Sequence, residues 1–512
     1  MASYSQSVFL ELFLTFAEKD RFAEWKEVVI DRSFVNRAFA PVFRYLAKFV
    51  PETVAPNVLT LSGSLAVLQA WHFCEEFSDT NPQVCTAISI AAITIFWGFG
   101  GIDGMHARRT MNDTSLGELF KYVCDLLSSV FLVVVLCSLL LEKDLDTQWY
   151  CVQSVQLVLL MKHYSAFMRE AGVRYFLVGP GELISWVTGL LALQGIGINI
   201  VGIAYNITWQ WTSQGLVRLL ELDKTGYLAT MSPARAAYLT VLYFTLCRIL
   251  SPTNRKHIWT RASLAMILLL RTFSGTLRME VLQDAQATTT KRDIIFDGLF
   301  LAMVTSDVIV SKMAGRELHV WVVLMASLVV LPHLSFITCV FVAFYYVGVF
   351  ADLMYHMNLP LLQVVRNVYC DGIYDLCHVG HKNLFRKALT LGNRLFVGVV
   401  GDDDANSYKR PPIMTAAERE NEVASCKCVT KVIPNAPCFG LTREFIEKHK
   451  IHIVAFGQEY LERFPDPKDD PYYRVPREMG IAKPLPRTEG LSTSDLIKRI
   501  QSRAADEKKS PT

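Results

Sequence analysis

Apolar residues are distributed unevenly along this 512-residue chain, and this distribution limits the folds that it can adopt. Up to about Met357 they form long runs, whereas beyond Leu359 their spacing is that of a water-soluble α/β protein. A helix that crosses a membrane needs about 20 mainly apolar residues. Because Pro360 favours the end of a helix, we predict a membrane domain at residues 1–357 and a soluble domain at residues 358–512.

The first domain is predicted to be polytopic and all-α, with about ten transmembrane helices. The candidate segments are residues 57–73, 84–99, 128–141, 149–161, 183–204, 236–250, 264–273, 298–310, 320–331 and 336–354. Charged side chains are expensive to bury in lipid, so those within such segments usually mark a site. Before them, residues 9–16 predict either an amphipathic helix on the membrane surface or a helix packed against the rest of the domain.

The charge balance and the cysteines bear on partners and compartment. The chain has 51 Lys and Arg against 48 Asp and Glu, a net charge of +3 that does not indicate a nucleic-acid partner. The twelve cysteines are scattered and lack the paired spacing of a disulfide framework. We therefore expect reduced, mostly buried cysteines.

Two histidines in the second domain lie at a predicted strand-to-helix turn. His378 and His381 follow an apolar run at residues 364–369 and precede a helical pattern at residues 382–391. Free backbone N–H groups and the helix dipole at such a turn favour an anion. Gly380 allows a phosphate to approach the backbone closely. These features favour a phosphate site, and the alternative is a capped loop with two surface histidines.

The rest of the second domain alternates between strand and helix patterns. We predict strands at residues 366–370, 395–400, 429–433 and 452–456, and helices at residues 382–391, 416–425, 442–448 and 494–500. This order predicts a parallel, doubly wound, Rossmann-like sheet with a nucleotide at the carboxyl ends of its strands.

The segment at residues 369–381 resembles the HxGH signature of the nucleotidyltransferases that make CDP-alcohols, in particular phosphocholine and phosphoethanolamine cytidylyltransferases. The resemblance covers about the last 140 residues, through Lys409, Ala417-Glu418-Arg419 and Asn435-Ala436-Pro437 to residues 487–495. It implies that CTP and a phosphoalcohol react to CDP-alcohol and pyrophosphate for phospholipid synthesis. It also implies a homodimer in which the two chains contact each other near residues 429–433. The alternative for this segment is a strand buried within the domain.

Carried over residue by residue, the resemblance assigns roles in the second domain. The implied catalytic residues are His378, His381, Lys409 and Arg487. The implied CTP-binding residues are Asp371, Gly372, Asp375, Gly380, Thr488, Ser492 and Thr493. Glu459, Tyr460 and Tyr473 are implied to bind the phosphoalcohol.

Simpler alternatives remain open for several of these residues. Lys409 could instead be a solvated loop lysine. Ser492 and Thr493 could simply form a helix N-cap, and the tyrosines could simply pack a loop. Mg²⁺ is expected to accompany CTP on phosphate oxygens, with no side chain assigned as its ligand. The family's His-Asp-Asp after the fourth strand is Phe456-Gly457-Gln458 here, so phosphocholine and phosphoethanolamine both remain open.

A second resemblance lies in the first domain. Residues 103–125 resemble the CDP-alcohol phosphotransferase signature, Asp-x2-Asp-Gly-x2-Ala-Arg-x8-Gly-x3-Asp-x3-Asp, and are similar to choline and ethanolamine phosphotransferases. The matching or replaced positions are Asp103, Gly104, Ala107, Arg108, Gly117, Glu118, Lys121 and Asp125. The family's carboxylates hold two divalent cations, which carry the CDP pyrophosphate.

The chain departs from that signature at the metal-binding carboxylates. Gly100 replaces the first aspartate and Lys121 the third, and the spacing allows Lys121 to pair with Asp125 on one helix face. We therefore predict that this half does not transfer phosphoalcohol to lipid. The alternatives are a bifunctional enzyme that also uses diacylglycerol, with Glu118 or Asp113 rescuing the site, and a membrane scaffold for a separate transferase.

The two resemblances together imply where the protein lies. An integral membrane protein of the endoplasmic reticulum is expected, and its C-terminal domain faces the cytosol because CTP is cytosolic. Permanent membrane helices would take the place of the amphipathic membrane-binding helix that soluble phosphocholine cytidylyltransferases commonly carry.

Overall fold

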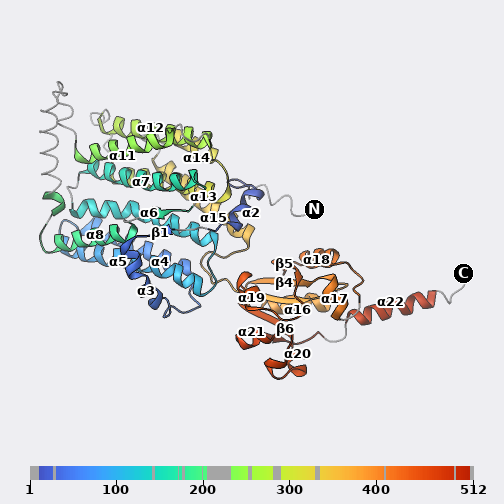
Figure 1. Cartoon of the computed structure of the whole chain (residues 1–512). Helices are drawn as coiled ribbons and strands as arrows, with labels where there is room; N and C mark the ends of the chain where they lie inside the picture. The colour runs from blue at the N-terminus through green and yellow to red at the C-terminus, as the bar shows by residue number, and fades with distance from the viewer. Residues whose placement is uncertain are drawn as a thin grey trace. The chain divides into compact units, whose positions relative to one another are not determined.

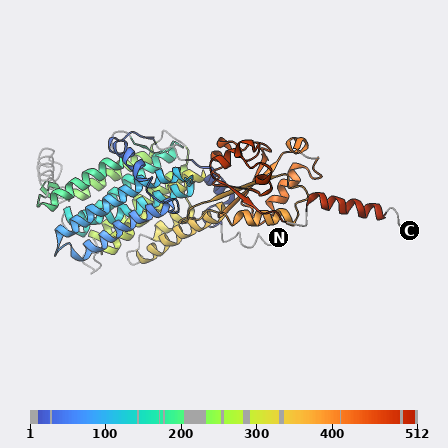
Figure 2. The same cartoon turned by 90° about the horizontal axis from the view of Figure 1, so that it is seen from below.

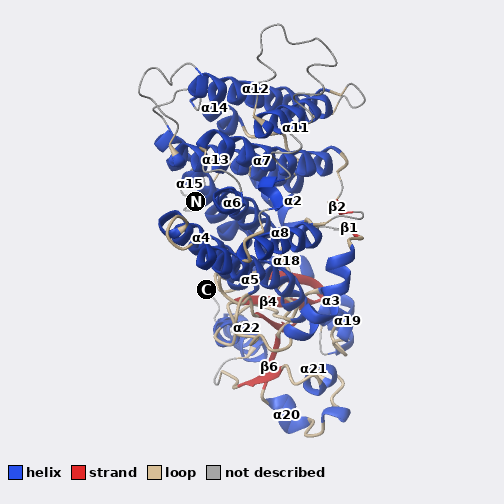
Figure 3. Ribbon diagram, turned by 90° about the vertical axis from the view of Figure 1, so that its left-hand side faces the viewer, coloured by secondary structure: helices blue, strands red, loops and turns tan. Residues whose placement is uncertain are grey.

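The computed structural model describes residues 11–26, 30–140, 144–170, 172–175, 179–198, 200–203, 232–251, 256–280, 290–328, 335–408, 411–488 and 492–507. They belong to two compact units, Met1–Leu362 (unit 1) and Gln363–Thr512 (unit 2). The division lies close to the predicted domain boundary. Helices fill unit 1, and the strands gather in unit 2 except for one short pair, β1 (Ile30–Asp31) with β2 (Arg174–Tyr175) (Figure 3).

Unit 1 is a bundle of helices packed side by side (Figures 1 and 2). They are α2 (Phe16–Glu24), α3 (Phe34–Leu46), α4 (Pro56–Phe77), α5 (Pro82–Arg109), α6 (Ser115–Leu140), α7 (Leu145–Met168), α8 (Pro180–Gly195), α11 (Pro233–Leu250), α12 (Ile258–Glu280), α13 (Lys291–Ala314), α14 (Val320–Leu328) and α15 (Ser335–Met357). Each predicted segment overlaps one of them, although residues 141, 199, 204 and 329–331 lie outside the described residues.

Within the described residues, four helices are long and apolar enough to cross a membrane. They are α5, α6, α13 and α15. The figure of about ten spans therefore stays a prediction. Helix α6 begins well before the predicted segment, because its first turns carry polar residues such as Glu118 and Lys121 that an apolar pattern does not register.

The N-terminal segment packs inside unit 1. Phe13 is 2% exposed, and its ring contacts those of His319, Phe344 and Tyr345. These contacts favour packing against the rest of the unit over a position on the membrane surface, but residues 11–15 are not helical and α2 begins only at Phe16, whereas residues 9 and 10 lie outside the described residues.

An ion pair holds α2 to α15. The Nζ atom of Lys19 lies 2.6 Å from Oδ1 of Asp352, and both side chains are buried. A buried charge is strongly destabilising without its partner, so the pair fixes where α2 lies.

Unit 2 is built on a five-stranded parallel sheet in the order β5-β4-β3-β6-β7. The strands are β3 (Asn367–Gly372), β4 (Arg394–Val400), β5 (Lys431–Ala436), β6 (Ile453–Gly457) and β7 (Ala482–Leu485). The first strand in the chain is central, and the order reverses between β3 and β6. That reversal is the switch point at which doubly wound sheets bind ligands, beyond the carboxyl ends of the strands. The predicted Rossmann-like fold is confirmed.

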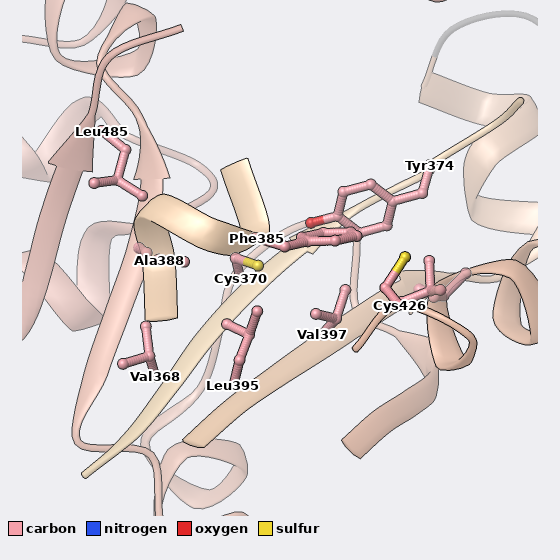
Figure 4. Packing of buried hydrophobic residues seen from close by; sticks show 12 residues of the cluster. Val368, Cys370, Tyr374, Phe385, Ala388, Leu395, Val397, Cys426 and Leu485 are labelled. Carbon is pink, nitrogen blue, oxygen red and sulfur yellow. The ribbon is translucent and has the colours of Figure 1, made fainter. Parts of the chain in front are cut away.

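Helices flank this sheet and close its core. They are α16 (Val379–Leu389), α17 (Asp402–Tyr408), α18 (Ala416–Ala424), α19 (Arg443–Lys448), α20 (Glu459–Arg463), α21 (Arg474–Glu478) and α22 (Thr493–Glu507), with a short 3₁₀ turn at Pro467–Asp469. Phe385 and Ala388 of α16 face Val368, Cys370 and Leu395 of the sheet (Figure 4). This packing fixes the helix whose N-terminus carries the two histidines.

Candidate active site

The loop that joins β3 to α16 has an unusual backbone. Tyr374 and Leu376 have φ angles of 54° and 53°, in the left-handed region that bulky residues seldom adopt. A side chain at Gly372 would approach the Tyr374 ring to 2.9 Å, so the glycine is needed for this turn. Such conformations cost about 1–3 kcal/mol each and persist only where their surroundings fix them. The turn places the Tyr374 ring edge-on to His381, with ring centroids 5.3 Å apart.

His378 is the N-cap of α16. Its Nδ1 accepts a hydrogen bond from the backbone N–H of Gly380 at 3.1 Å, so this nitrogen carries no proton. Burial lowers the pKa of His378, which favours the neutral ring at neutral pH. The proton of the neutral ring is therefore on Nε2. The fold thus sets the tautomer and leaves one N–H donor beyond the end of the helix.

The second histidine stacks on the first. The rings of His378 and His381 are 4.0 Å apart with an interplanar angle of 22°. Thr493, in the first turn of α22, places its Oγ1 3.4 Å from Nε2 of His378 and donates to the carbonyl oxygen of Asp375 at 3.4 Å. Two helix N-termini therefore meet at the histidines, and both favour an anion.

Asp375 organises a neighbouring loop. Its carboxylate is 6% exposed and accepts the backbone N–H groups of Ile413 and Met414 at 3.0–3.1 Å. Asp375, which the resemblance assigns to CTP binding, thus orients the loop at residues 411–414. The same loop leads back to Lys409, which lies outside the described residues.

Arg419 holds the strand ends together, although the sequence did not single it out as a site residue. Its side chain is fully buried and donates to the carbonyl oxygens of Ile373, Val400 and Met414 and to Oδ1 of Asp402. Ile373 directly follows β3 and Val400 is the last residue of β4, so the guanidinium joins the ends of these two strands. The signal in the sequence was its place in the matched motif Ala417-Glu418-Arg419, but the burial of an arginine cannot be read from spacing.

Asp371, near the end of β3, contacts Tyr473, which lies 102 positions further along the chain. The Tyr473 hydroxyl donates to Oδ1 of Asp371 at 2.7 Å. Burial raises the pKa of Asp371 to about 6, partly opposed by the hydrogen bond from Tyr473. A residue predicted for CTP thus touches one predicted for the phosphoalcohol.

The tyrosines form an aromatic cluster beside this carboxylate. The Tyr473 ring is 6% exposed and packs on Phe456 and Tyr460, with centroids 4.9 and 5.1 Å apart. Its ring therefore does pack a loop, as the simpler alternative held, and its hydroxyl reaches the site. Tyr460 is half-buried and Glu459 is exposed at the start of α20.

The remaining predicted residues lie around the start of α22. The Ser492 hydroxyl donates to Oδ2 of Asp495 at 2.6 Å, and Asp495 N–H donates back at 3.2 Å, which is the geometry of an N-cap. Arg487 is exposed after β7, and Thr488 is half-buried. Among the described residues, no hydrogen bond or ion pair joins Arg487 to His378 or His381.

Unit 1 contains a pocket of about 100 Å³ at the predicted degenerate transferase site. It is lined by Pro56, Asn57, Thr60, Asp103, Gly104, Ala107, Arg108, Asn112, Asp113, Thr114, Gly117, Glu118 and Lys121. Asp103 is buried there, and both of its oxygens are engaged. Nζ of Lys121 lies 2.6 Å from Oδ1, and the Thr60 hydroxyl donates to Oδ2 at 2.7 Å.

The predicted pairing of Lys121 with Asp125 is not what the structure contains. Lys121 pairs with Asp103 on α5 and also donates to the carbonyl oxygen of Gly100, whereas Asp125 makes no ion pair among the described residues. A pair four residues apart on a helix surface is worth only about 0.2–0.5 kcal/mol. The buried Asp103 carboxylate needs a partner far more, so it takes the ammonium.

Comparisons with known proteins agree with the geometry of unit 2. Residues 369–499 match the family described as cytidylyltransferase-like. Unit 2 thus contains a cytidylyltransferase-like domain.

The individual relatives that the chain resembles are cytidylyltransferases with named substrates. The chain is 39% identical over 135 residues to ethanolamine-phosphate cytidylyltransferase of Dictyostelium discoideum (26% of this chain, 37% of the relative). It is 41% identical over 135 residues to choline-phosphate cytidylyltransferase 2 of Arabidopsis thaliana (26% and 44%). It is 36% identical over 138 residues to the mouse ethanolamine-phosphate enzyme (27% and 33%). The chain spans less than half the length of each relative, and both head groups occur among them.

Proposed function

We propose that the protein is a membrane-anchored cytidylyltransferase that joins CTP to phosphocholine or phosphoethanolamine and releases pyrophosphate. The observation that carries the proposal is the stacked pair of His378 and His381 at the N-terminus of α16, with Thr493 beside it. This group lies after the central strand of a doubly wound sheet, where such folds bind nucleotides. The match of residues 369–499 to the cytidylyltransferase-like family supports it.

The chemistry follows from charge. A phosphate oxygen of the phosphoalcohol attacks the α-phosphorus of CTP, and the bond from this phosphorus to the bridging oxygen of pyrophosphate breaks. Such transfer depends on positioning and on stabilising the charge of the leaving group. His378, through its Nε2–H, and His381 are proposed to donate to phosphate oxygens, while Lys409 and Arg487 neutralise the triphosphate.

Mg²⁺ is proposed to accompany CTP. The ion would be bound mainly through phosphate oxygens and would supply charge neutralisation there.

Recognition of the alcohol is assigned to Asp371 and the aromatic cluster. An ionised carboxylate beside aromatic rings attracts an ammonium group, and Tyr473 fixes the carboxylate that lies at the end of β3. Glu459 and Tyr460 would line the outer part of this subsite.

Asp371 gives the enzyme an expected pH dependence. Its pKa is raised to about 6, and only the ionised form attracts the ammonium, so KM for the phosphoalcohol should rise as pH falls through about 6. The Tyr473 hydroxyl stabilises the ionised form. Tyr473→Phe should therefore raise the pKa further and move the midpoint of the KM profile up by about one pH unit.

The matched control is Tyr460→Phe, because Tyr460 packs on Tyr473 but has no hydrogen bond to Asp371. Its KM profile should keep the wild-type midpoint. A midpoint that stays fixed or moves down in Tyr473→Phe would remove Asp371 from alcohol recognition.

Unit 1 is proposed to be a membrane anchor derived from a CDP-alcohol phosphotransferase and inactive as a transferase. The Lys121–Asp103 ion pair supports this, because it places an ammonium where the family's carboxylates hold metal. A position in the endoplasmic reticulum with unit 2 in the cytosol, and a homodimer, are part of the same proposal.

One assay separates the proposed function from the bifunctional alternative and the scaffold. The full chain in detergent is given CTP with each phosphoalcohol in labelled form, with and without diacylglycerol. We expect CDP-alcohol to accumulate in both conditions. Labelled phosphoalcohol that appears in lipid would establish the bifunctional enzyme, and no CDP-alcohol in any condition would leave only the scaffold.

A further inference from the structure

The pocket of unit 1 has accessible positive charge at the place where the phosphotransferase signature has metal-binding carboxylates. The Lys121 side chain is 36% exposed, whereas that of Asp103 is 5% exposed. A ligand in the pocket therefore reaches the Lys121 ammonium more readily than the Asp103 carboxylate. Arg108 also lines the pocket, together with Asn57 in the first turn of α4 and Thr114 directly before α6.

The carboxylates of the pocket do not fit a divalent cation. Both oxygens of Asp103 already accept hydrogen bonds from Lys121 and Thr60. Asp113 and Glu118 line the same pocket, yet no group of three ligating side chains exists among the described residues. Hard divalent cations need several anionic oxygens, so the rescue of a metal site by these carboxylates has no support.

We propose that this pocket binds a phosphate-bearing anion without any divalent metal, with the Lys121 ammonium in place of the metal charge. Two cations, Lys121 and Arg108, face the space, and the positive ends of two long helices border it. Asp103 then serves to position the ammonium. Part of this proposal rests on the proposed function. The products of unit 2, a CDP-alcohol and pyrophosphate, both carry a phosphoanhydride, which is the kind of anion that the pocket would bind.

The test measures binding rather than turnover. Equilibrium dialysis of the full chain in detergent micelles with EDTA would use labelled CDP-choline in one arm and labelled pyrophosphate in the other. At least one probe should bind, and Lys121→Met should weaken that binding about 10- to 100-fold. Lys121→Arg, which keeps the cation, should retain most of it. The two arms show which source of phosphoanhydride the pocket takes.

A matched control is Lys291→Met, which also breaks a 2.6 Å ion pair, with Glu75, but lies away from the pocket. It should bind both probes like the wild type. Equal binding by Lys121→Met and wild type, binding that requires Mg²⁺, or no binding of either probe in EDTA would overturn the inference. Lys121-dependent binding in a protein that makes no CDP-alcohol would instead refute the proposed function alone.

A reversal experiment covers the case in which Lys121→Met does not fold. A Cβ at Gly100 would meet nothing within 4 Å, so an aspartate fits there. Gly100→Asp combined with Lys121→Asp restores both missing carboxylates. This variant should gain Mg²⁺ binding in calorimetry and should bind the nucleotide only with Mg²⁺. Equal Mg²⁺ binding by this variant and the wild type would contradict an internal ammonium in the metal's place.

Discussion

Replacing His378 by asparagine should lower kcat for CDP-alcohol formation about 10²- to 10³-fold while the fold remains intact. Asparagine is a favoured N-cap, so its oxygen can still accept the Gly380 N–H that Nδ1 of His378 now accepts. It does not reach the position of Nε2, however. The variant thus removes the N–H donor and keeps the cap. Loss of one donor to a developing charge typically costs about 10²–10³ in kcat.

The matched variant is His378→Ala, which removes both functions. It should lose a similar factor in kcat and also about 1 kcal/mol of stability from the missing cap. His381→Ala should lower kcat to a comparable extent, because its ring is stacked on His378 at 4.0 Å. Steady-state rates of pyrophosphate release, with KM reported separately, provide the measurement. Wild-type kcat in His378→Asn would show that the helix cap is the whole role of this residue.

Replacing Arg419 by methionine should destabilise unit 2 by about 3–5 kcal/mol. Its guanidinium is fully buried and paired with Asp402, and it also serves three backbone carbonyl oxygens. Methionine fills part of the volume but leaves the three carbonyl acceptors without this donor, at about 1–3 kcal/mol for each buried acceptor. Asp402 is half-exposed, so the loss of its ion pair adds little. Because the contacts fix the ends of β3 and β4, kcat/KM should also fall by about 10² through misplacement of the site.

Hydrogen exchange measured by mass spectrometry on the full chain gives the local free energies of opening for peptides of unit 2. Arg474→Met is the control, since its pair with Glu478 is exposed and lies within one helix turn. Such pairs are worth about 0.3–0.5 kcal/mol. Equal protection in Arg419→Met and Arg474→Met would mean that the buried contacts of Arg419 do not stabilise the strand ends.

The buried strands were the most predictable part of the fold. Residues of β3 and β6 are buried on both faces, so they read as short apolar runs, and the predicted segments fall on them. Strand β7 was missed because Lys483 and Pro484 interrupt any such run. An edge strand tolerates both residues, since one side of it makes no sheet hydrogen bonds.

The site was predictable only where it is local in the sequence. The strand, the turn and the helix around His378 lie within one short segment. The sequence therefore placed the histidines correctly at the N-terminus of α16. The contact between Asp371 and Tyr473 joins residues 102 positions apart. Spacing on one helix likewise suggested Asp125 for Lys121, whereas the partner was supplied by another helix.

The ion pair between Lys19 and Asp352 has a consequence for the biosynthesis of the chain. Helix α2 leaves the ribosome first among the described helices, but its partner α15 is the last helix of unit 1. Because Asp352 is synthesised late, the Lys19 ammonium must remain hydrated during translation until nearly all of unit 1 has been made. Closure of the bundle becomes a late event, which coincides with the start of synthesis of unit 2.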